Sequence, residues 1–322
     1  MIERRLWNGQ TIPALGLGCW AIGGPFFSGS QPLGWGEVDD AVSIRAIHAA
    51  YDIGIRFFDT SDAYGTGHSE EILGTALADR HDVVIATKFG NTYDRASRQL
   101  TGTDVSDRHI REALDASCKR LNRDRVALYQ LHVDTLGPEA TEVCDTLNSL
   151  VAEGRIEAFG WSTDSLDQAK RWPGSVGYRA VQHACNLFVP AKALIQFCED
   201  EKMLSINRSP LAMGALTSKF DSDTEMTQAD IRARPPAWLP YFSNGRPKPE
   251  FAARINAVRD LLTSGGRTLA QGALAWIWAG SDVSLPIPGF RTEAQVQENA
   301  IALERGPFPS PVKAEIDNLL AV

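Results

Sequence analysis

The sequence predicts an α/β fold in which eight parallel strands alternate with helices and close into a TIM-type (β/α)8 barrel. Eight short apolar, β-favouring runs are each followed by helical spacing of apolar residues, and no change of composition separates these units. The 322 residues suffice for the roughly 250 of such a barrel plus insertions. Residues suited to chemistry recur where the strands end, the edge that carries active sites in this fold. We therefore expect one domain over residues 1–322.

The expected elements follow from the spacing of apolar residues. An Asn8-Gly9 turn between short alternating runs predicts a hairpin that closes one end of the barrel. Strands are expected at 14–19, 55–58, 83–87, 126–131, 156–159, 180–184, 203–206 and 283–287. Helices are expected at 38–52, 68–79, 106–121 (capped by Ser106), 139–153, 165–172, 193–201, 251–263, 269–278, 292–303 and 311–320.

Three stretches between these elements are expected to be irregular. Residues 21–40 are rich in Gly, Pro and aromatic side chains, residues 89–105 are polar, and a second long loop runs from 207 to about 249. Long loops in compact domains are usually functional or disordered. The aromatic residues in the first and third stretches favour an apolar lid over a linker.

Composition limits the partners and the location. The chain is 43% hydrophobic and 22% charged, with a net charge of −8 and a pI near 5.3. This charge argues against nucleic acid or an anionic membrane as the main partner, and no apolar run approaches the ~18 residues of a membrane span. The N-terminus lacks the apolar stretch of a signal peptide. Five scattered cysteines without a C-x-x-C pair favour a reducing cytoplasm.

An acid, a phenol and an ammonium lie close to two successive strand ends. Asp59 follows one strand, Tyr64 lies in the turn after it, and Lys88 ends the next strand. Moving a Tyr pKa from ~10 to near neutrality takes ~4 kcal/mol, and one ammonium at ~4 Å in an effective dielectric of ~20 contributes about that much. Asp59 could hold Lys88 charged while Lys88 favours the Tyr64 phenolate. A structural ion pair beside a capping Tyr is the alternative.

His132 follows the fourth strand and is expected at the same rim, which favours function over a purely structural role. Two other patterns point to different chemistry. Residues 16–21 (GLGCWA) match the dinucleotide fingerprint G-x-G-x-x-A, but a long loop follows where that fingerprint needs a helix. His132, Asp134 and His183 could ligate a metal in a barrel hydrolase. Adjacent strand residues alternate faces, however, so His183 points away from the barrel interior if Gln182 points to its mouth.

Eight motifs in this chain resemble those of the aldo-keto reductase superfamily, in the family's order along nearly the whole sequence. They are GLGCW, FFDTSDAYG, TKFG, YQLH, FGWS, VQHACNLF, SPLAMGALTSKF and PIPGFRTEAQVQEN. The resemblance implies that Asp59, Tyr64, Lys88 and His132 form a catalytic tetrad. Tyr64 would protonate the carbonyl oxygen of an aldehyde or ketone during reduction and act as the base in reverse. Lys88, paired to Asp59, would lower the pKa of Tyr64, and His132 would orient the carbonyl.

The resemblance also implies a cofactor, NADPH, from whose nicotinamide ring the hydride would come. Contacts to the nicotinamide carboxamide would come from Ser162, Gln182 and Asn186. Contacts to the pyrophosphate would come from Ser209, Pro210, Leu211, Gly214 and Leu216. Contacts to the adenosine end would come from Gly289, Arg291, Gln295, Glu298 and Asn299. Arg291 suits a 2′-phosphate, which makes NADH less likely than NADPH; a surface residue at a helix start is the alternative for Arg291.

The chain departs from the commoner family pattern at two places. Thr163 follows Ser162 where many members have Asn, which weakens one amide contact. Asn207 and Arg208 stand where many members have a Tyr that stacks on the nicotinamide. An Arg guanidinium can lie flat against a ring or bind phosphate, so Arg208 is expected to contact the cofactor.

Aromatic residues of the long loops are expected to form the substrate pocket and to favour an apolar or aromatic substrate. One wall would comprise Trp20, Phe26, Phe27, Trp35 and Trp161, and the lid would comprise Trp238, Tyr241 and Phe242. The expected function is reversible, NADPH-dependent reduction of a small-molecule aldehyde or ketone. A regulatory subunit that binds the cofactor with little turnover, as some family members do, is the alternative. The sequence leaves open whether the protein is a monomer or a homo-oligomer.

Overall fold

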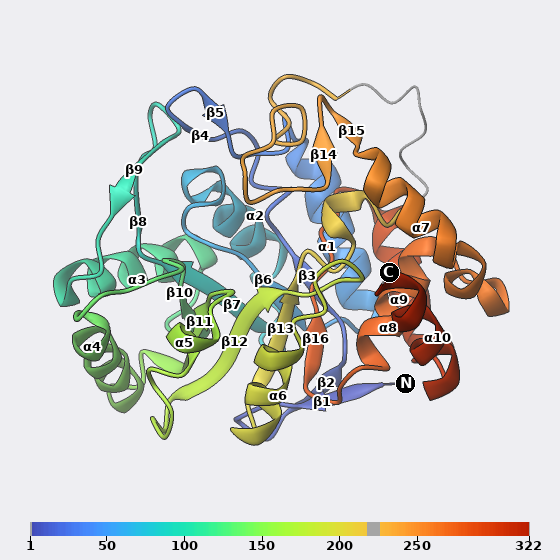
Figure 1. Cartoon of the computed structure of the whole chain (residues 1–322). Helices are drawn as coiled ribbons and strands as arrows, with labels where there is room; N and C mark the ends of the chain where they lie inside the picture. The colour runs from blue at the N-terminus through green and yellow to red at the C-terminus, as the bar shows by residue number, and fades with distance from the viewer. Residues whose placement is uncertain (1, 218–225, 322) are drawn as a thin grey trace.

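The centre of the protein is a parallel barrel, seen here in a computed structural model that describes residues 2–217 and 226–321 (Figure 1). Its strands pair in the order β3 (Gly16–Gly18), β6 (Phe57–Asp59), β7 (Val84–Phe89), β10 (Val126–Leu131), β11 (Ile156–Ser162), β12 (Tyr178–Ala184), β13 (Leu204–Arg208) and β16 (Ser284–Pro286). Gly18 closes the ring, because its amide donates to Pro288 O at 3.0 Å and it pairs in parallel with Gly289. The predicted (β/α)8 barrel is confirmed.

Helices surround the barrel (Figure 1). They are α1 (Asp40–Ile53), α2 (His68–Ala76), α3 (Asp107–Leu121), α4 (Ala140–Ala152), α5 (Leu166–Ala169), α6 (Lys192–Asp200), α7 (Pro249–Leu262), α8 (Leu269–Trp278), α9 (Glu293–Arg305) and α10 (Ser310–Leu320), with short 3-10 helices η1 (Tyr64–Gly67), η2 (Ala212–Gly214) and η3 (Ser264–Gly266). Ser106 caps α3 as predicted. Helix α5 is shorter than expected, because it ends at Ala169 and residues 170–172 form a turn and a bend.

The core has two parts, and the N-terminal hairpin belongs to the inner one. The hairpin consists of β1 (Glu3–Arg5) and β2 (Thr11–Pro13). Leu6 and Ile12 pack with apolar side chains that point into the barrel from its strands. Arg4 fixes the hairpin to the last strand by donating to Ser284 O at 2.9 Å. The hairpin thus closes one end of the barrel, as predicted, and the larger cluster lies between strands and helices.

The long connections lie at the end of the barrel opposite to the hairpin (Figure 1). The prediction that residues 89–105 are irregular is wrong. They form a hairpin, β8 (Asn91–Asp94) and β9 (Gln99–Thr103), which joins β4 (Phe27–Ser28) and β5 (Gln31–Pro32) in one four-stranded sheet. A further pair, β14 (Phe242–Ser243) and β15 (Arg246–Pro247), lies in the second long loop. None of the described helices is long and apolar enough to cross a membrane.

We predict that Gly65→Ala destabilises the protein much more than Gly9→Ala. Both glycines have a positive φ, +59° and +84°, which costs an alanine roughly 1 kcal/mol. A Cβ on Gly65 would lie 1.8 Å from Gly23 O, whereas nothing lies within 4 Å of a Cβ on Gly9. Urea unfolding should show a loss of roughly 1 kcal/mol for Gly9→Ala and more than about 3 kcal/mol for Gly65→Ala. Equal losses would contradict a tight contact between the two active-end loops.

Candidate functional site

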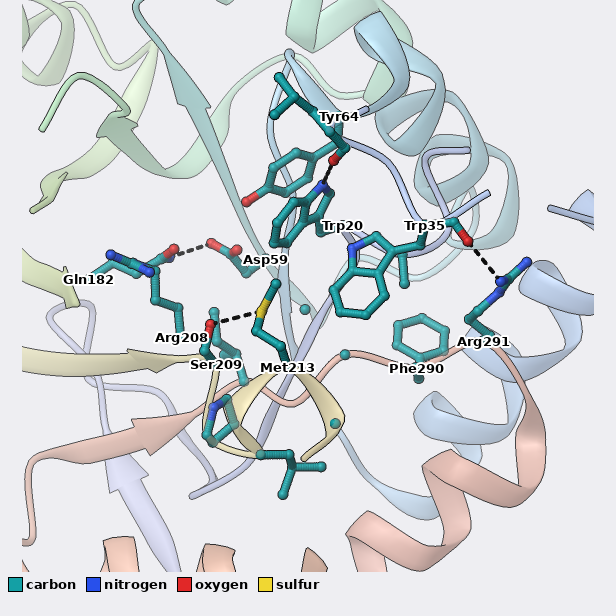
Figure 2. A pocket seen from close by; sticks show the side chains of 18 of the residues that line it. Trp20, Trp35, Asp59, Tyr64, Gln182, Arg208, Ser209, Met213, Phe290 and Arg291 are labelled. Carbon is teal, nitrogen blue, oxygen red and sulfur yellow. Dashed lines mark hydrogen bonds between the residues drawn. The ribbon is translucent and has the colours of Figure 1, made fainter. Parts of the chain in front are cut away.

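A cavity of about 570 Å³ opens at the carboxyl ends of the barrel strands. Figure 2 shows Asp59 and Gln182 on one side of it and Arg291 on the other, with the indoles of Trp20 and Trp35 between Tyr64 and Arg291. The cavity therefore extends from the ends of the central strands to the start of α9.

The deepest part of this region is a buried ion pair. Lys88 Nζ donates to Asp59 Oδ2 at 2.6 Å, to Thr60 O at 2.8 Å and to Tyr64 OH at 3.2 Å. Asp59 Oδ1 accepts from the side-chain amides of Gln130 at 3.0 Å and Gln182 at 2.7 Å. Both charged groups are almost completely shielded from water. Full pairing of this kind is what makes two buried charges tolerable.

Burial and Lys88 act in opposite directions on Tyr64. Burial raises the pKa of the phenol, Lys88 lowers it and Asp59 raises it, and the result lies above the ordinary value for tyrosine. Burial lowers the pKa of Lys88, but Asp59 and Tyr64 more than offset this, so the ammonium stays charged. Lys88 thus lowers the pKa of Tyr64, as expected, but burial outweighs this effect and the pKa stays above its ordinary value. Tyr64 therefore holds its proton at neutral pH, beside a cation that can stabilise the phenolate once the proton leaves.

His132 follows β10 and lines the cavity beside Tyr64. The two ring centroids are 5.7 Å apart and the ring planes are nearly perpendicular, at 85°. Burial, and then the charges of Lys88 and Arg208, lower the pKa of His132 well below its usual value, so the imidazole is neutral. The four side chains predicted from strand ends thus come together at one place.

Most of the residues expected to hold a cofactor line the same cavity. They are Ser162, Gln182, Arg208, Ser209, Pro210, Leu211, Gly214, Gly289, Arg291, Gln295, Glu298 and Asn299. Asn186 and Leu216 do not line it, so the cavity does not support direct contacts between these two residues and a cofactor. Asn186 is buried and donates to Ser209 O at 3.0 Å and to Tyr241 OH at 2.9 Å, and so fixes the loop instead. Leu216 is buried in the larger apolar core.

The two departures from the family pattern have different places in the structure. Thr163 is buried, donates to Asp134 Oδ1 at 3.1 Å and does not line the cavity. Asn207 is buried too, and its amide donates to Ser205 Oγ at 3.0 Å. Arg208 lines the cavity and forms an ion pair with Asp164. Of these positions, Arg208 is the one that a ligand in the cavity can reach.

Arg291 connects the far end of the cavity to the first long loop (Figure 2). Its guanidinium donates to the backbone carbonyls of Trp35, at 3.1 Å, and Glu37. Its own amide donates to Gln295 Oε1 at 2.7 Å. A guanidinium carries more N–H groups than these two carbonyls use. Arg291 therefore has a structural role and retains donors for an anion.

Four aromatic residues form one apolar wall of the cavity: Trp20, Phe26, Trp35 and Trp238. The Trp20 ring lies centrally, with centroid distances of 5.4 Å to Trp35, 5.9 Å to Tyr64 and 6.2 Å to Trp238. Trp238 is 56% exposed, as expected of a side chain at the mouth. These aromatic residues agree with the predicted wall and lid.

The other four predicted aromatic residues lie elsewhere. Strand β11 continues to Ser162, so Trp161 faces the surrounding helices; it is fully buried, packs on Trp172 at 4.3 Å between ring centroids, and donates to Val133 O. Phe27 is in β4 and does not line the cavity, because successive strand residues face opposite sides. Tyr241 and Phe242 are part of the apolar core.

Several residues at the site were missed by the sequence analysis. Gln130 is one whose signal was available, as a polar residue inside an apolar strand. Met213 lines the cavity from η2, and Arg232 lies over the Trp35 ring with 4.5 Å from Cζ to the ring centroid. Nothing in the sequence places these two at the site, because each comes from an irregular loop. Residues 218–220, the end of the SPLAMGALTSKF motif, lie outside the described residues.

Metal ligation is not supported among residues 2–217 and 226–321, where no group of three His, Cys, Asp or Glu side chains could hold an ion. His183 lies 2.8 Å from Ser205 Oγ through Nε2 and is fully buried. Gln182, its neighbour, lines the cavity. The alternation expected along this strand is therefore confirmed.

Comparison with known proteins identifies the family. The model of the Aldo/keto reductase family matches residues 14–321. The chain belongs to this family. Its residues 16–21 open into a loop rather than a helix, so the dinucleotide fingerprint there is a coincidence of sequence.

Two curated relatives and one solved structure illustrate the similarity. The aldo-keto reductase yakc [NADP(+)] of Schizosaccharomyces pombe is 29% identical, covering 94% of this chain and 87% of that protein. The NADH-specific methylglyoxal reductase of Escherichia coli is 30% identical, covering 91% and 90%. The glycerol dehydrogenase AKR11B4 from Gluconobacter oxydans superposes with a TM-score of 0.82 at 28% identity, covering 99% and 95%.

We predict that Lys88→Met and Asp59→Asn are non-additive. Each single change leaves one buried charge without its partner, and breaking a buried pair typically costs about 3–5 kcal/mol. The double variant removes both charges and should be more stable than the sum of the two losses allows, by more than about 1 kcal/mol. Urea unfolding of the four proteins gives this coupling. Simple additivity would contradict direct coupling between Lys88 and Asp59.

Proposed function

We propose that the protein is an NADP(H)-dependent oxidoreductase that reversibly reduces an aldehyde or ketone to an alcohol. One observation carries the proposal: the hydroxyl of Tyr64 lies 3.2 Å from the charged Lys88 at the end of an elongated cavity, with the neutral His132 beside it. A carbonyl oxygen that accepts a hydride on its carbon needs one positioned acid and one polarising group. Tyr64 and His132 meet that need.

The cavity suits an extended dinucleotide. It runs without interruption from Tyr64 to Arg291. Between them, Ser209, Met213 and Gly214 have positive φ angles of 52°, 57° and 97°, so the loop backbone turns sharply beside the cavity. Successive amides in such turns form concavities that bind anions such as phosphate. Arg208 and Arg291 add positive charge along the same path.

The choice between the two nicotinamide cofactors rests on Arg291. The names of the relatives divide, one specifying NADP(+) and one NADH. A guanidinium binds a phosphate group through charge-assisted hydrogen bonds. Arg291 lines the far end of the cavity and is the residue that would hold the adenosine 2′-phosphate of NADPH. We therefore propose NADPH as the preferred cofactor.

In the proposed mechanism the protein supplies acid, orientation and a dry cavity, and the bound cofactor supplies the hydride. Tyr64 donates its proton to the carbonyl oxygen as the alcohol forms. Lys88 stabilises the resulting phenolate, and Asp59 keeps Lys88 charged and oriented. His132 orients the carbonyl oxygen through Nε2. In alcohol oxidation the same residues act in reverse, with the Tyr64 phenolate as the base.

The proposed substrate is a small apolar or aromatic carbonyl compound. Trp20 offers a flat apolar surface next to Tyr64, and Trp238 offers another next to Trp20; such rings bind apolar ligands by burial and stacking. We further propose one barrel domain over residues 1–322 acting in the cytoplasm. The net charge of −8 supports neither nucleic acid nor an anionic membrane as its partner.

We predict that Tyr64→Phe abolishes turnover without abolishing cofactor binding. Loss of the acid should lower kcat by about a thousandfold, since phenylalanine keeps the ring but has no proton to give. NADPH affinity, from fluorescence titration, should stay within about threefold of the wild type. Tyr51→Phe is the matched control, because Tyr51 bonds to the exposed Asp82 away from the cavity.

The assay is NADPH consumption over a panel of aldehydes and ketones. Equal loss of binding and turnover in Tyr64→Phe would contradict the acid role. Tight NADPH binding by the wild type with no turnover of any carbonyl would instead indicate a regulatory subunit.

We predict that Arg291→Met weakens NADPH much more than NADH. Losing charge-assisted hydrogen bonds to a phosphate should raise the NADPH Kd by roughly 10- to 100-fold. The NADH Kd should change only about threefold, through the lost contacts to the first long loop. Arg259→Met, at an exposed position of α7, is the control. Parallel weakening of both cofactors would show that Arg291 acts only through that loop.

A further inference from the structure

A short buried chain of hydrogen bonds leads from His132 to two residues that do not line the cavity. His132 Nδ1 lies 3.0 Å from Ser61 Oγ, and Ser61 Oγ lies 3.1 Å from Asp62 Oδ1. Asp62 is 1% exposed and Ser61 is fully buried. The mechanism above uses neither residue. His132 Nε2 is the ring nitrogen left for a ligand in the cavity.

Ser61 has a single hydroxyl proton, which restricts the donor and acceptor roles along this series of hydrogen bonds. A serine hydroxyl donates one hydrogen bond and accepts two. The amide of Ala63 donates to Ser61 Oγ at 3.1 Å and uses one acceptor position. The single Ser61 proton can therefore point either to Asp62 or to His132, and the other neighbour must donate to Ser61.

These two arrangements leave different tautomers of a neutral His132. If Asp62 is ionised, Ser61 donates to it, and His132 must carry its proton on Nδ1. Nε2 is then a bare acceptor, which repels a carbonyl oxygen. If Asp62 is protonated, Asp62 donates to Ser61 and Ser61 donates to Nδ1. The imidazole proton is then on Nε2, where it can donate to a carbonyl oxygen.

We propose that Asp62 is a positioning residue that holds a proton and, through Ser61, fixes His132 in the tautomer with Nε2–H facing the cavity. The consequence for catalysis rests on the proposed function, whereas the tautomer itself does not. Asp62 touches neither cofactor nor substrate. It acts through two hydrogen bonds on the group that orients the carbonyl.

The charges around Asp62 favour its protonated form. Burial, and then the Glu70 carboxylate on α2, raise the pKa of Asp62, whereas Arg120 on α3 and hydrogen bonds from Ser61 and Ala63 lower it, and the resulting pKa is about 8. Arg120 is already paired with Glu70, at 2.6 Å from Nε to Oε2. Among the residues that the structure describes, none therefore gives Asp62 a cation of its own, and Asp62 keeps its proton at neutral pH.

The other titratable groups near these hydrogen bonds do not change the preference of Asp62 for its protonated form. Tyr93 on β8 and Tyr129 on β10 also face Asp62, and burial raises the pKa of both phenols, so they stay neutral. Lys88 on β7 and Arg208 on β13 face His132 and keep the ring neutral. Above pH 8 Asp62 loses its proton, and the Ser61 hydroxyl then donates to Asp62 instead of to His132. The His132 proton moves from Nε2 to Nδ1 as a result.

The first test reads the tautomer directly, in the full-length protein with 15N-labelled histidine. The two ring nitrogens of His132, assigned by comparison with His132→Gln, are followed by NMR from pH 6 to pH 10. The expected result is protonated Nε2 at pH 7 and exchange of the two signals with a midpoint near pH 8. Protonated Nδ1 at pH 7 would overturn the proposal. No substrate is needed, so this result is independent of whether the protein turns over a carbonyl.

The second test uses two variants that cut the chain. In Ser61→Ala and in Asp62→Asn the exchange of nitrogen signals between pH 7 and pH 9 should disappear, whereas Ser149→Ala, an exposed serine on α4, should retain it. Exchange that persists in either variant would show that another group controls His132, and would overturn the proposal. If a variant does not fold, the wild-type titration alone decides.

The same variants separate positioning from a merely structural role through the pH profile. With a midpoint near pH 8, wild-type kcat/KM for carbonyl reduction should fall about tenfold from pH 7 to pH 9. Ser61→Ala should lack this fall, because nothing relays the loss of the Asp62 proton. If kcat/KM of Ser61→Ala falls from pH 7 to pH 9 as it does in the wild type, the proposal is overturned. Absence of turnover in the wild type would refute the proposed function and leave the NMR result standing.

Discussion

The active end of this barrel depends on the ion pair between Lys88 and Asp59. Two charges without access to water are stable only if every donor and acceptor is satisfied, and here a backbone carbonyl and two glutamine side chains complete the set. Gln130 and Gln182 come from β10 and β12, so the pair joins four strands at the mouth. Because Lys88 is anchored this strongly, it also fixes the position of Tyr64, to which its ammonium donates as well.

Tyr64 is held from the other side by loop geometry. It begins η1, where Gly65 and Thr66 have positive φ angles of 59° and 54°, and the Gly65 backbone lies against Gly23. Trp20 stacks on the phenol ring. The phenol is thus confined between an ammonium and an indole, and burial keeps its proton in place. This combination favours a proton donor at neutral pH, whose product, the phenolate, is stabilised by a charge already present.

The sequence predicted the site residues whose positions follow from strand order. It misplaced residues whose positions depend on the direction of the side chain. Asp59, Lys88 and His132 were predictable because carboxyl ends of parallel strands converge, whatever the exact strand length. Trp161 was misplaced because β11 runs longer than its apolar run, which reverses the face on which Trp161 lies. The β8–β9 hairpin was missed because its side chains are polar and partly exposed, so no burial pattern marks it. The contact of Arg291 with Trp35 joins residues 256 positions apart, which no local pattern reveals.

Within residues 2–217 and 226–321, the cations that line the cavity are all partnered, and their partners differ in a way that matters for an anionic ligand. Arg208 is paired with a carboxylate, whereas Arg291 is bonded to two neutral carbonyls. A phosphate that approaches Arg208 must compete with the carboxylate already paired to it. The net gain is only the difference between the two interaction energies. At Arg291 it competes with weaker, uncharged acceptors, so most of the charge-assisted interaction is a net gain. The proposed preference for NADPH therefore rests on Arg291, although Arg208 lies closer to the reacting groups.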